Sequence, residues 1–241
     1  MKIKLVILLI VISSSFSYSQ ILNSIGFKGG VSLSNHNWND TFWQPYFNFT
    51  PIPSFYGVIS AEFVNKEHWN IMTDLGYYQS GSNVVFNPNT FRYFGLESLP
   101  GDSKFTIGFI TFSPAIKLKT QINKITPFIF IGPRVDYYNT ALNKNEIIYY
   151  SNDITNKPIW GFNIGEGFCY RIKRFSIIAE YKFLYSFTYI IDRPDHYSYP
   201  DIPRDRLKTS THVISIGLKY HFNKKETSVT PAPEQINSIN N

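Results

Sequence analysis

The sequence predicts an all-β protein, an eight-stranded antiparallel up-and-down transmembrane barrel. Three observations lead to this fold: apolar side chains recur at every second residue, short and long connections alternate, and the charges gather on one face of the expected strands. Of the 241 residues, 43% are hydrophobic and 17% are charged. This composition excludes a disordered chain, and the single cysteine excludes a disulfide-stapled miniprotein and a CxxC metal site.

The first residues have the three parts of a secretory signal peptide. Lys2 and Lys4 precede an apolar run at 5–12, and small residues, Ser17 and Ser19, precede Gln20. We therefore expect a signal peptide over 1–19. Removing its two lysines lowers the formal charge from +6 to 6 − 2 = +4, which is too small and too scattered to indicate a nucleic-acid partner. No later stretch supplies the ~18 consecutive apolar residues of a membrane helix.

The strands are predicted from their period of two. Ile214, Ile216 and Leu218 share one face of the last strand, and Ser215 and Lys219 share the other. This alternation is typical of a strand that is apolar on one side only. It predicts eight strands, each long enough to cross a bilayer at a tilt, at about 25–34, 54–65, 68–80, 104–119, 125–139, 158–171, 174–188 and 209–222.

The connections between these strands alternate strictly between short and long. Short polar connections follow the second, fourth and sixth strands, and the long ones span 35–53, 81–103, 140–157 and 189–208. A transmembrane barrel has this arrangement, with tight periplasmic turns and long outer loops, whereas a soluble sandwich has no reason for it. We therefore expect a barrel domain over 20–222, followed by a flexible periplasmic tail over 223–241.

The two faces of the strands decide between a membrane barrel and a soluble, lipocalin-like one. The apolar face carries large aromatic residues such as Trp69, Trp160 and Tyr181, which an eight-stranded lumen could hardly hold. The other face must then line the lumen, where its charges pair with one another. It carries Glu62 and Lys117 together with a predicted charge network of Lys28, Asp74, Arg134, Asp136, Glu180, Lys182 and Lys219.

Three residues interrupt this pattern. Glu166 falls on the apolar face if alternation is strict, and a carboxylate facing lipid is costly. A bulge at the flanking Gly165 and Gly167 would turn it inward. Bulges are also the expected arrangement at Pro114 and Pro133, because proline removes a donor from the strand ladder.

Several segments resemble the PorT-like outer-membrane barrel family of Bacteroidetes. They are IGFKGGVSLS at 25–34, TPF at 126–128 with the following Gly132 and Pro133, the strand with Gly165 and Gly167, EYKF at 180–183, and SIGLKY at 215–220. The resemblance implies an eight-stranded outer-membrane barrel, usually without an assigned activity. The founding member of that family is linked to type IX secretion.

We predict that the protein has a structural or interaction role in the outer membrane and is not an enzyme. No histidines or cysteines have metal-ligand spacing, so no metal and no cofactor are predicted. The alternative is a lipid A-modifying enzyme that uses His212 with Ser210 and Thr211, or the segment 195–198, at the outer rim. A narrow channel is a third possibility, which the filled interior of an eight-stranded barrel disfavours.

The outer loops hold the candidate contacts. The first contains Trp38, Trp43 and Tyr46, and the last contains Arg193, Arg204 and Arg206. The aromatic residues either cap the barrel mouth or contact lipopolysaccharide, a glycan or an envelope protein, and the arginines suit lipid phosphates. The candidate partners are therefore outer-membrane lipid, lipopolysaccharide and an envelope protein that contacts the outer loops.

Overall fold

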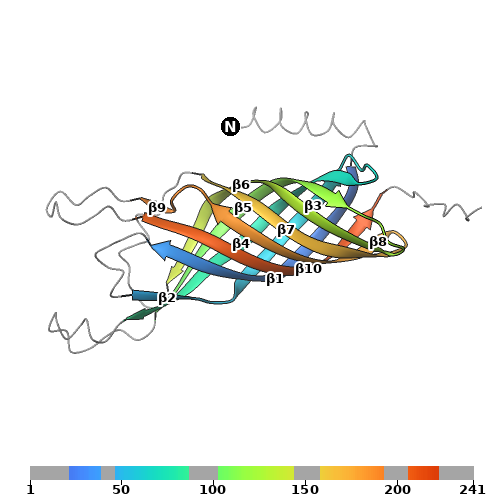
Figure 1. Ribbon diagram of the computed structural model, residues 1–241. Helices are drawn as coiled ribbons and strands as arrows, with labels where there is room; N and C mark the ends of the chain where they lie inside the picture. Colours follow the sequence, from blue (N-terminus) through green and yellow to red (C-terminus); the bar gives the residue numbers. More distant parts are fainter. Residues whose placement is uncertain (1–21, 39–46, 87–102, 144–157, 193–205, 223–241) are drawn as a thin grey trace, which may run out of the picture.

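The computed structural model describes residues 22–38, 47–86, 103–143, 158–192 and 206–222, and all of its regular structure is β (Figure 1). The predicted signal peptide and tail lie outside these ranges. The strands are β1 (Leu22–Trp38), β2 (Phe47–Pro51), β3 (Ser54–Phe63), β4 (Trp69–Phe86), β5 (Ser103–Lys119), β6 (Ile125–Asn143), β7 (Ile159–Ile172), β8 (Phe175–Ser186), β9 (Ile191–Asp192) and β10 (Arg206–His221). Among the described residues, no helix has the length and apolar character to cross a membrane.

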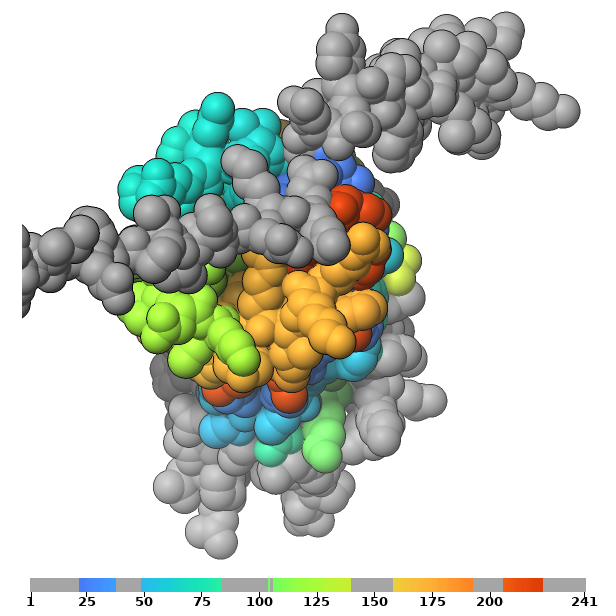
Figure 2. Space-filling model, turned by 90° about the vertical axis from the view of Figure 1, so that its right-hand side faces the viewer, coloured from blue at the N-terminus to red at the C-terminus, as the bar shows by residue number. Residues whose placement is uncertain are grey.

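Eight of these strands close into one barrel. Each pairs antiparallel with the next in the order β1-β3-β4-β5-β6-β7-β8-β10, and β1 pairs with β10 from Ser24–His221 to Trp38–Leu207. The predicted fold class, an eight-stranded antiparallel up-and-down barrel, is thereby confirmed. The short turns at 64–68, 120–124 and 173–174 lie at one end, called here the turn end (Figure 2). The opposite end is called the loop end.

Two short strands at the loop end were assigned to loops by the sequence pattern, and that assignment is wrong. The strand β2 pairs with β4 from Phe47–Phe86 to Pro51–Ser82, so it continues the course of β3. The strand β9 pairs with β10. These pairings depend on backbone hydrogen bonds beyond the apolar part of the barrel, where side chains no longer need to alternate.

The apolar side chains point out of the barrel and the charges point in. Phe27 is 60% exposed, whereas its neighbour Lys28 is 1% exposed. The exposed apolar side chains form a continuous band around the barrel, called here the apolar belt. Its members include Phe27, Val31, Phe55, Ile59, Leu75, Phe112, Ile116, Ile129, Ile131, Trp160, Ile164, Phe168, Tyr170, Ile177, Ile214, Ile216 and Leu218. The predicted orientation of the two faces is confirmed, because only a membrane barrel is apolar outside and charged inside.

Glu166 is not turned inward, so the bulge expected beside it is absent. The β6–β7 register is unbroken from Ile125–Tyr170 to Asp136–Ile159, and Glu166 is exposed on the outward face. The flanking glycines instead leave room for side chains inside the lumen. A Cβ at Gly165 would lie 2.4 Å from the Phe130 ring, and a Cβ at Gly167 would lie 2.8 Å from the Phe128 ring.

The two prolines are also accommodated without bulges. The β5–β6 register is the same at Phe112–Val135 and at Ile116–Ile131, which places Pro114 opposite Pro133. The ladder is interrupted between these two pairs, and the one register shift in this pairing lies away from the prolines, between Gly108 and Phe109. The two residues without a backbone donor thus face each other, and neither removes a hydrogen bond from a third strand.

The backbone is tightly packed beside this proline pair, which leads to a prediction for Gly132. A Cβ at Gly132 would lie 2.0 Å from the Pro114 carbonyl oxygen. We expect Gly132→Ala to lower the free energy of unfolding by about 1–3 kcal/mol, because the strands must separate to admit the methyl group. Urea unfolding in lipid vesicles measures this. The control is Gly29→Ala, whose Cβ would meet nothing closer than 3.7 Å. Equal stabilities of the two variants would contradict the prediction.

Candidate functional site

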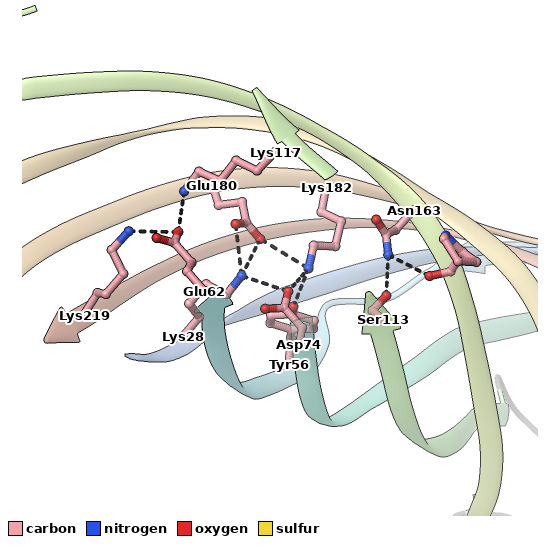
Figure 3. Close-up of polar contacts among 11 residues, drawn as sticks. Lys28, Tyr56, Glu62, Asp74, Ser113, Lys117, Asn163, Glu180, Lys182 and Lys219 are labelled. Atoms are coloured by element: carbon pink, nitrogen blue, oxygen red, sulfur yellow. Dashed lines mark hydrogen bonds and ion pairs between the residues drawn. The ribbon is translucent and has the colours of Figure 1, made fainter. Parts of the chain in front are cut away.

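The lumen contains a central group of four alternating charges (Figure 3). The Lys28 ammonium on β1 donates to Asp74 Oδ2 on β4 at 2.8 Å and to Glu180 Oε2 on β8 at 3.0 Å. Lys182, also on β8, donates to the same Asp74 oxygen and lies 3.3 Å from Glu180 Oε1. Two cations and two anions therefore neutralise one another. All four side chains are almost completely buried, and such burial requires this pairing.

A second group lies near the turn end. The Glu62 carboxylate on β3 accepts from Lys117 at 2.7 Å and from Lys219 at 2.9 Å, and its other oxygen accepts from Ser24 at 3.1 Å. Lys117 also lies 3.7 Å from the centre of the Phe128 ring, in a cation–π contact. This group carries one anion and two cations, so the ring face adds partial negative potential where the carboxylate alone is insufficient.

A third group is built on β6. The Arg134 guanidinium lies 3.2 Å from Asp136 Oδ2 and donates to the Ser186 hydroxyl at 2.9 Å. The Tyr78 hydroxyl donates to Asp136 Oδ2 at 2.8 Å. With this group, the buried charges of the lumen among the described residues have a formal balance of 5 − 4 = +1. They are Lys28, Lys117, Arg134, Lys182 and Lys219 against Glu62, Asp74, Asp136 and Glu180.

An apolar cluster fills the lumen toward the loop end. Phe109 is fully buried, and its ring centre lies 5.2 Å from that of Tyr78. Ile190 and Ile191, which follow β8, are fully buried in the same cluster, and the Ile190 amide donates to the Leu207 carbonyl at 2.8 Å. The segment after β8 therefore packs its apolar side chains into the mouth of the barrel.

The structure places all seven residues of the predicted charge network in the lumen, but in three groups. Lys219 joins Glu62 and Lys117, which the sequence had put on the same face but outside the network. The tyrosines of the network were missed. Lys182 donates to the Tyr56 hydroxyl at 3.0 Å. Alternation along β3 already places Tyr56 on the face of Glu62, so that signal was available.

The candidate outer-loop contacts are described only in part. Arg206 lies 3.4 Å from Asp192 and stacks over the Tyr189 ring at 5.0 Å. The backbone of Trp38 pairs with Leu207 at the end of β1. Trp43, Tyr46, Arg193 and Arg204 lie outside the described residues.

Of the residues considered for an enzyme, Ser210, Thr211 and His212 lie in the part of the chain that the structure describes, where Ser210 shares the outward face with His212 and no hydrogen bond joins His212 to either of the others. His212 faces outward, and its Nδ1 is 2.7 Å from the Tyr181 hydroxyl. Thr211 faces the lumen, where it bonds Ser34 at 2.8 Å, so it cannot pair with His212 across the sheet. The segment 195–198 lies outside the described residues. Within those residues, no group of three His, Cys, Asp or Glu side chains could hold a metal ion.

An antiparallel barrel with an apolar outside and a paired, charged inside is a transmembrane barrel of the outer-membrane class. A family model described as an outer membrane protein beta-barrel domain matches residues 15–192. The chain belongs to this family, and it is an outer-membrane protein.

The solved structures that resemble this chain are also outer-membrane barrels. The outer membrane protein OprG from Pseudomonas aeruginosa has a TM-score of 0.49 at 10% identity, and the match covers 84% of this chain and 98% of OprG. Neisserial surface protein A has a TM-score of 0.46 at 10% identity, covering 83% and 96%. The attachment invasion locus protein Ail of Yersinia pestis, in complex with the heparin analogue sucrose octasulfate, has a TM-score of 0.38 at 9% identity, covering 82% and 99%. No curated protein matches the sequence.

Proposed function

We propose that this protein is a closed outer-membrane barrel with a structural or interaction role, acting through its outer loops as an accessory to a larger envelope assembly. The observation that supports this proposal is that the lumen is blocked at two levels. The Lys182–Asp74 ion pair connects opposite walls in its centre, and an apolar cluster that includes Ile190 and Ile191 fills it toward the loop end. A barrel filled in this way is suited to holding its loops rigidly rather than to passing solutes.

The finer form of the proposal follows the resemblance to the PorT-like barrels of Bacteroidetes. In this form, residues 1–19 are removed on export, residues 20–222 form the barrel, and residues 223–241 reach into the periplasm. The secretion link of that family makes a secretion complex one candidate assembly.

Lipopolysaccharide is the proposed lipid partner at the loop end. Arg206 and Lys208 face outward there and flank Tyr189, with the Lys208 ammonium 4.6 Å from the ring centre. Two cations held beside an aromatic ring suit the phosphate groups of a lipid headgroup. Arg193 and Arg204 belong to the same outer loop and would add to this charge.

Electrical recording tests whether the lumen is closed. We expect the purified, folded protein to give no stepwise conductance in a planar lipid bilayer, because the ion pairs and the apolar cluster leave no continuous water path. A band shift between heated and unheated gel samples verifies folding in the same preparation. Steady single-channel steps from folded protein would contradict the proposal and favour the narrow channel.

Mass spectrometry of lipid A tests the remaining alternative. We expect lipid A to be unchanged when the gene is deleted, since the His212 ring is bonded to the Tyr181 hydroxyl and no hydrogen bond joins it to Ser210 among the described residues. A modification that disappears with the gene, or with His212→Ala, would instead show a lipid-modifying enzyme.

A further inference from the structure

Glu166 is an ionisable side chain in the middle of the apolar belt. The outward-facing residues of β7 run from Trp160 to Ile172, and Glu166 lies midway between these two large apolar residues. Its neighbours across the sheet are Ile129 on β6 and Tyr181 on β8. A carboxylate at this depth faces the hydrocarbon of the bilayer, where an unpaired charge is strongly disfavoured.

The described part of the barrel offers Glu166 no compensation. None of its hydrogen bonds or ion pairs involves the Glu166 carboxylate, and the continuous register on both sides of β7 keeps it facing outward. The lysine and arginine side chains outside the lumen among the described residues lie near the loop end (Lys104, Arg206 and Lys208) or at the turn end (Lys66, Lys119, Lys124, Arg171, Lys173 and Arg174), and no hydrogen bond or ion pair joins one of them to Glu166. The charges of the lumen lie on the other side of the sheet.

Glu166 also lies in a groove of about 1010 Å³ on the outside of the barrel. The groove crosses β5, β6, β7, β8 and β10 and reaches His68 and Lys119 at the turn end, where Lys119 donates to Asn65. On β7, β8 and β10 it is lined by two outward residues and the residue between them. Its floor is low at Ala179, which lies directly between Phe168 on β7 and Ile216 on β10. One small side chain between two large ones leaves room for a side chain from another molecule.

We propose that this groove is a docking surface for a membrane-embedded segment of a second envelope protein, with Glu166 pairing to a lysine or arginine on that segment. The choice of occupant follows from charge. Lipid acyl chains would fill the groove but leave the carboxylate unpaired. A second copy of this chain would bring no lysine or arginine to this depth, because its described cations outside the lumen lie near the loop end or at the turn end. A partner segment that presents a basic side chain both fills the groove and pairs with the Glu166 carboxylate.

This lateral docking goes beyond the role proposed for the outer loops and is independent of it. A failure of the loop contacts or of the closed lumen would leave the groove and Glu166 unchanged. Conversely, a groove that binds only lipid would leave the closed barrel and its loop contacts intact.

Photo-crosslinking in the native outer membrane tests the proposal. The full-length protein carries p-benzoylphenylalanine in place of Phe168, which lines the groove, or in place of Phe27, which is equally apolar and exposed but lies on β1 outside it. We expect a protein adduct from position 168 and none from position 27. Mass spectrometry should place the cross-link in a membrane-embedded segment of the partner that contains a lysine or arginine.

The dependence of the cross-link on the Glu166 charge distinguishes a specific docking partner from a protein that lies nearby by chance. We expect Glu166→Gln to reduce the adduct from position 168 about tenfold, since it removes one partner of a desolvated charge pair. Replacing the partner's basic residue with methionine should reduce it similarly, and the two changes together should add little further. The heated and unheated gel samples verify that each variant is folded. Lipid adducts alone, an adduct with a second copy, or an adduct that Glu166→Gln leaves unchanged would each overturn the proposal.

Discussion

Replacing Asp74 with leucine is expected to lower the free energy of unfolding by about 3–5 kcal/mol. One oxygen of Asp74 accepts from both Lys28 and Lys182, and all three side chains are at most 2% exposed. Without this carboxylate, two buried ammonium groups share Glu180 alone. The loss should exceed what the removed contacts are worth, because the remaining charge is left without a partner in a site of low dielectric.

Urea unfolding of the folded barrel in lipid vesicles measures this loss. The matched control is Thr73→Leu, a change at the neighbouring residue on the outward face, which we expect to alter stability little. The double variant Asp74→Leu with Lys182→Met should recover part of the loss, because it restores the balance between Lys28 and Glu180. A fully stable Asp74→Leu protein would mean that solvent reaches the group and that the pairing is not required.

Replacing Phe109 with alanine is expected to lower the free energy of unfolding by about 3–5 kcal/mol. Phe109 is fully buried in the apolar cluster at the loop end and packs against Tyr78. Removing the ring leaves a cavity that the sheet around it cannot collapse to fill. It also frees Tyr78, which donates to Asp136, so the third group of the lumen should loosen as well.

The same unfolding measurement tests this, with Phe112→Ala as the control. Phe112 lies on the same strand but faces outward, at 44% exposure, so lipid takes the place of its ring. We expect a clearly smaller loss for Phe112→Ala. If the two variants lose equal stability, the apolar cluster contributes no more than the outer surface does, and the mouth of the barrel is not sealed by packing.

The strands and their faces could be predicted because they depend on local chemistry. Successive side chains of a strand face lipid and lumen in turn, so apolar and polar residues alternate in the sequence, as at Ile214 and Ser215. The short polar turns mark one end of the barrel. The lumen side of the seven network residues follows from the same rule. The sequence does not predict which of them contact one another, because Asp74 on β4 and Lys182 on β8 meet across the barrel, from strands that are not paired.

The errors of the sequence reading share one cause. Glycine and proline were taken as signs of bulges, yet Gly165 and Gly167 make room for phenylalanine rings inside the barrel. Pro114 and Pro133 face each other, an arrangement that depends on the register between two strands. A single strand does not contain that information. The strand β2 was missed for a similar reason, because its partner on β4 lies beyond the apolar belt.

The central charge group has a consequence for how the barrel is assembled. Its contacts join residues far apart in the chain: Lys28 and Glu180 are separated by 152 positions, and Asp74 and Lys182 by 108. Contacts of such long range form late in folding. An incomplete sheet would expose unpaired ammonium and carboxylate groups along its inner wall, so partly inserted forms are penalised until β10 meets β1. Closure of the barrel and neutralisation of its interior are thus one cooperative event, which favours an all-or-none transition into the membrane.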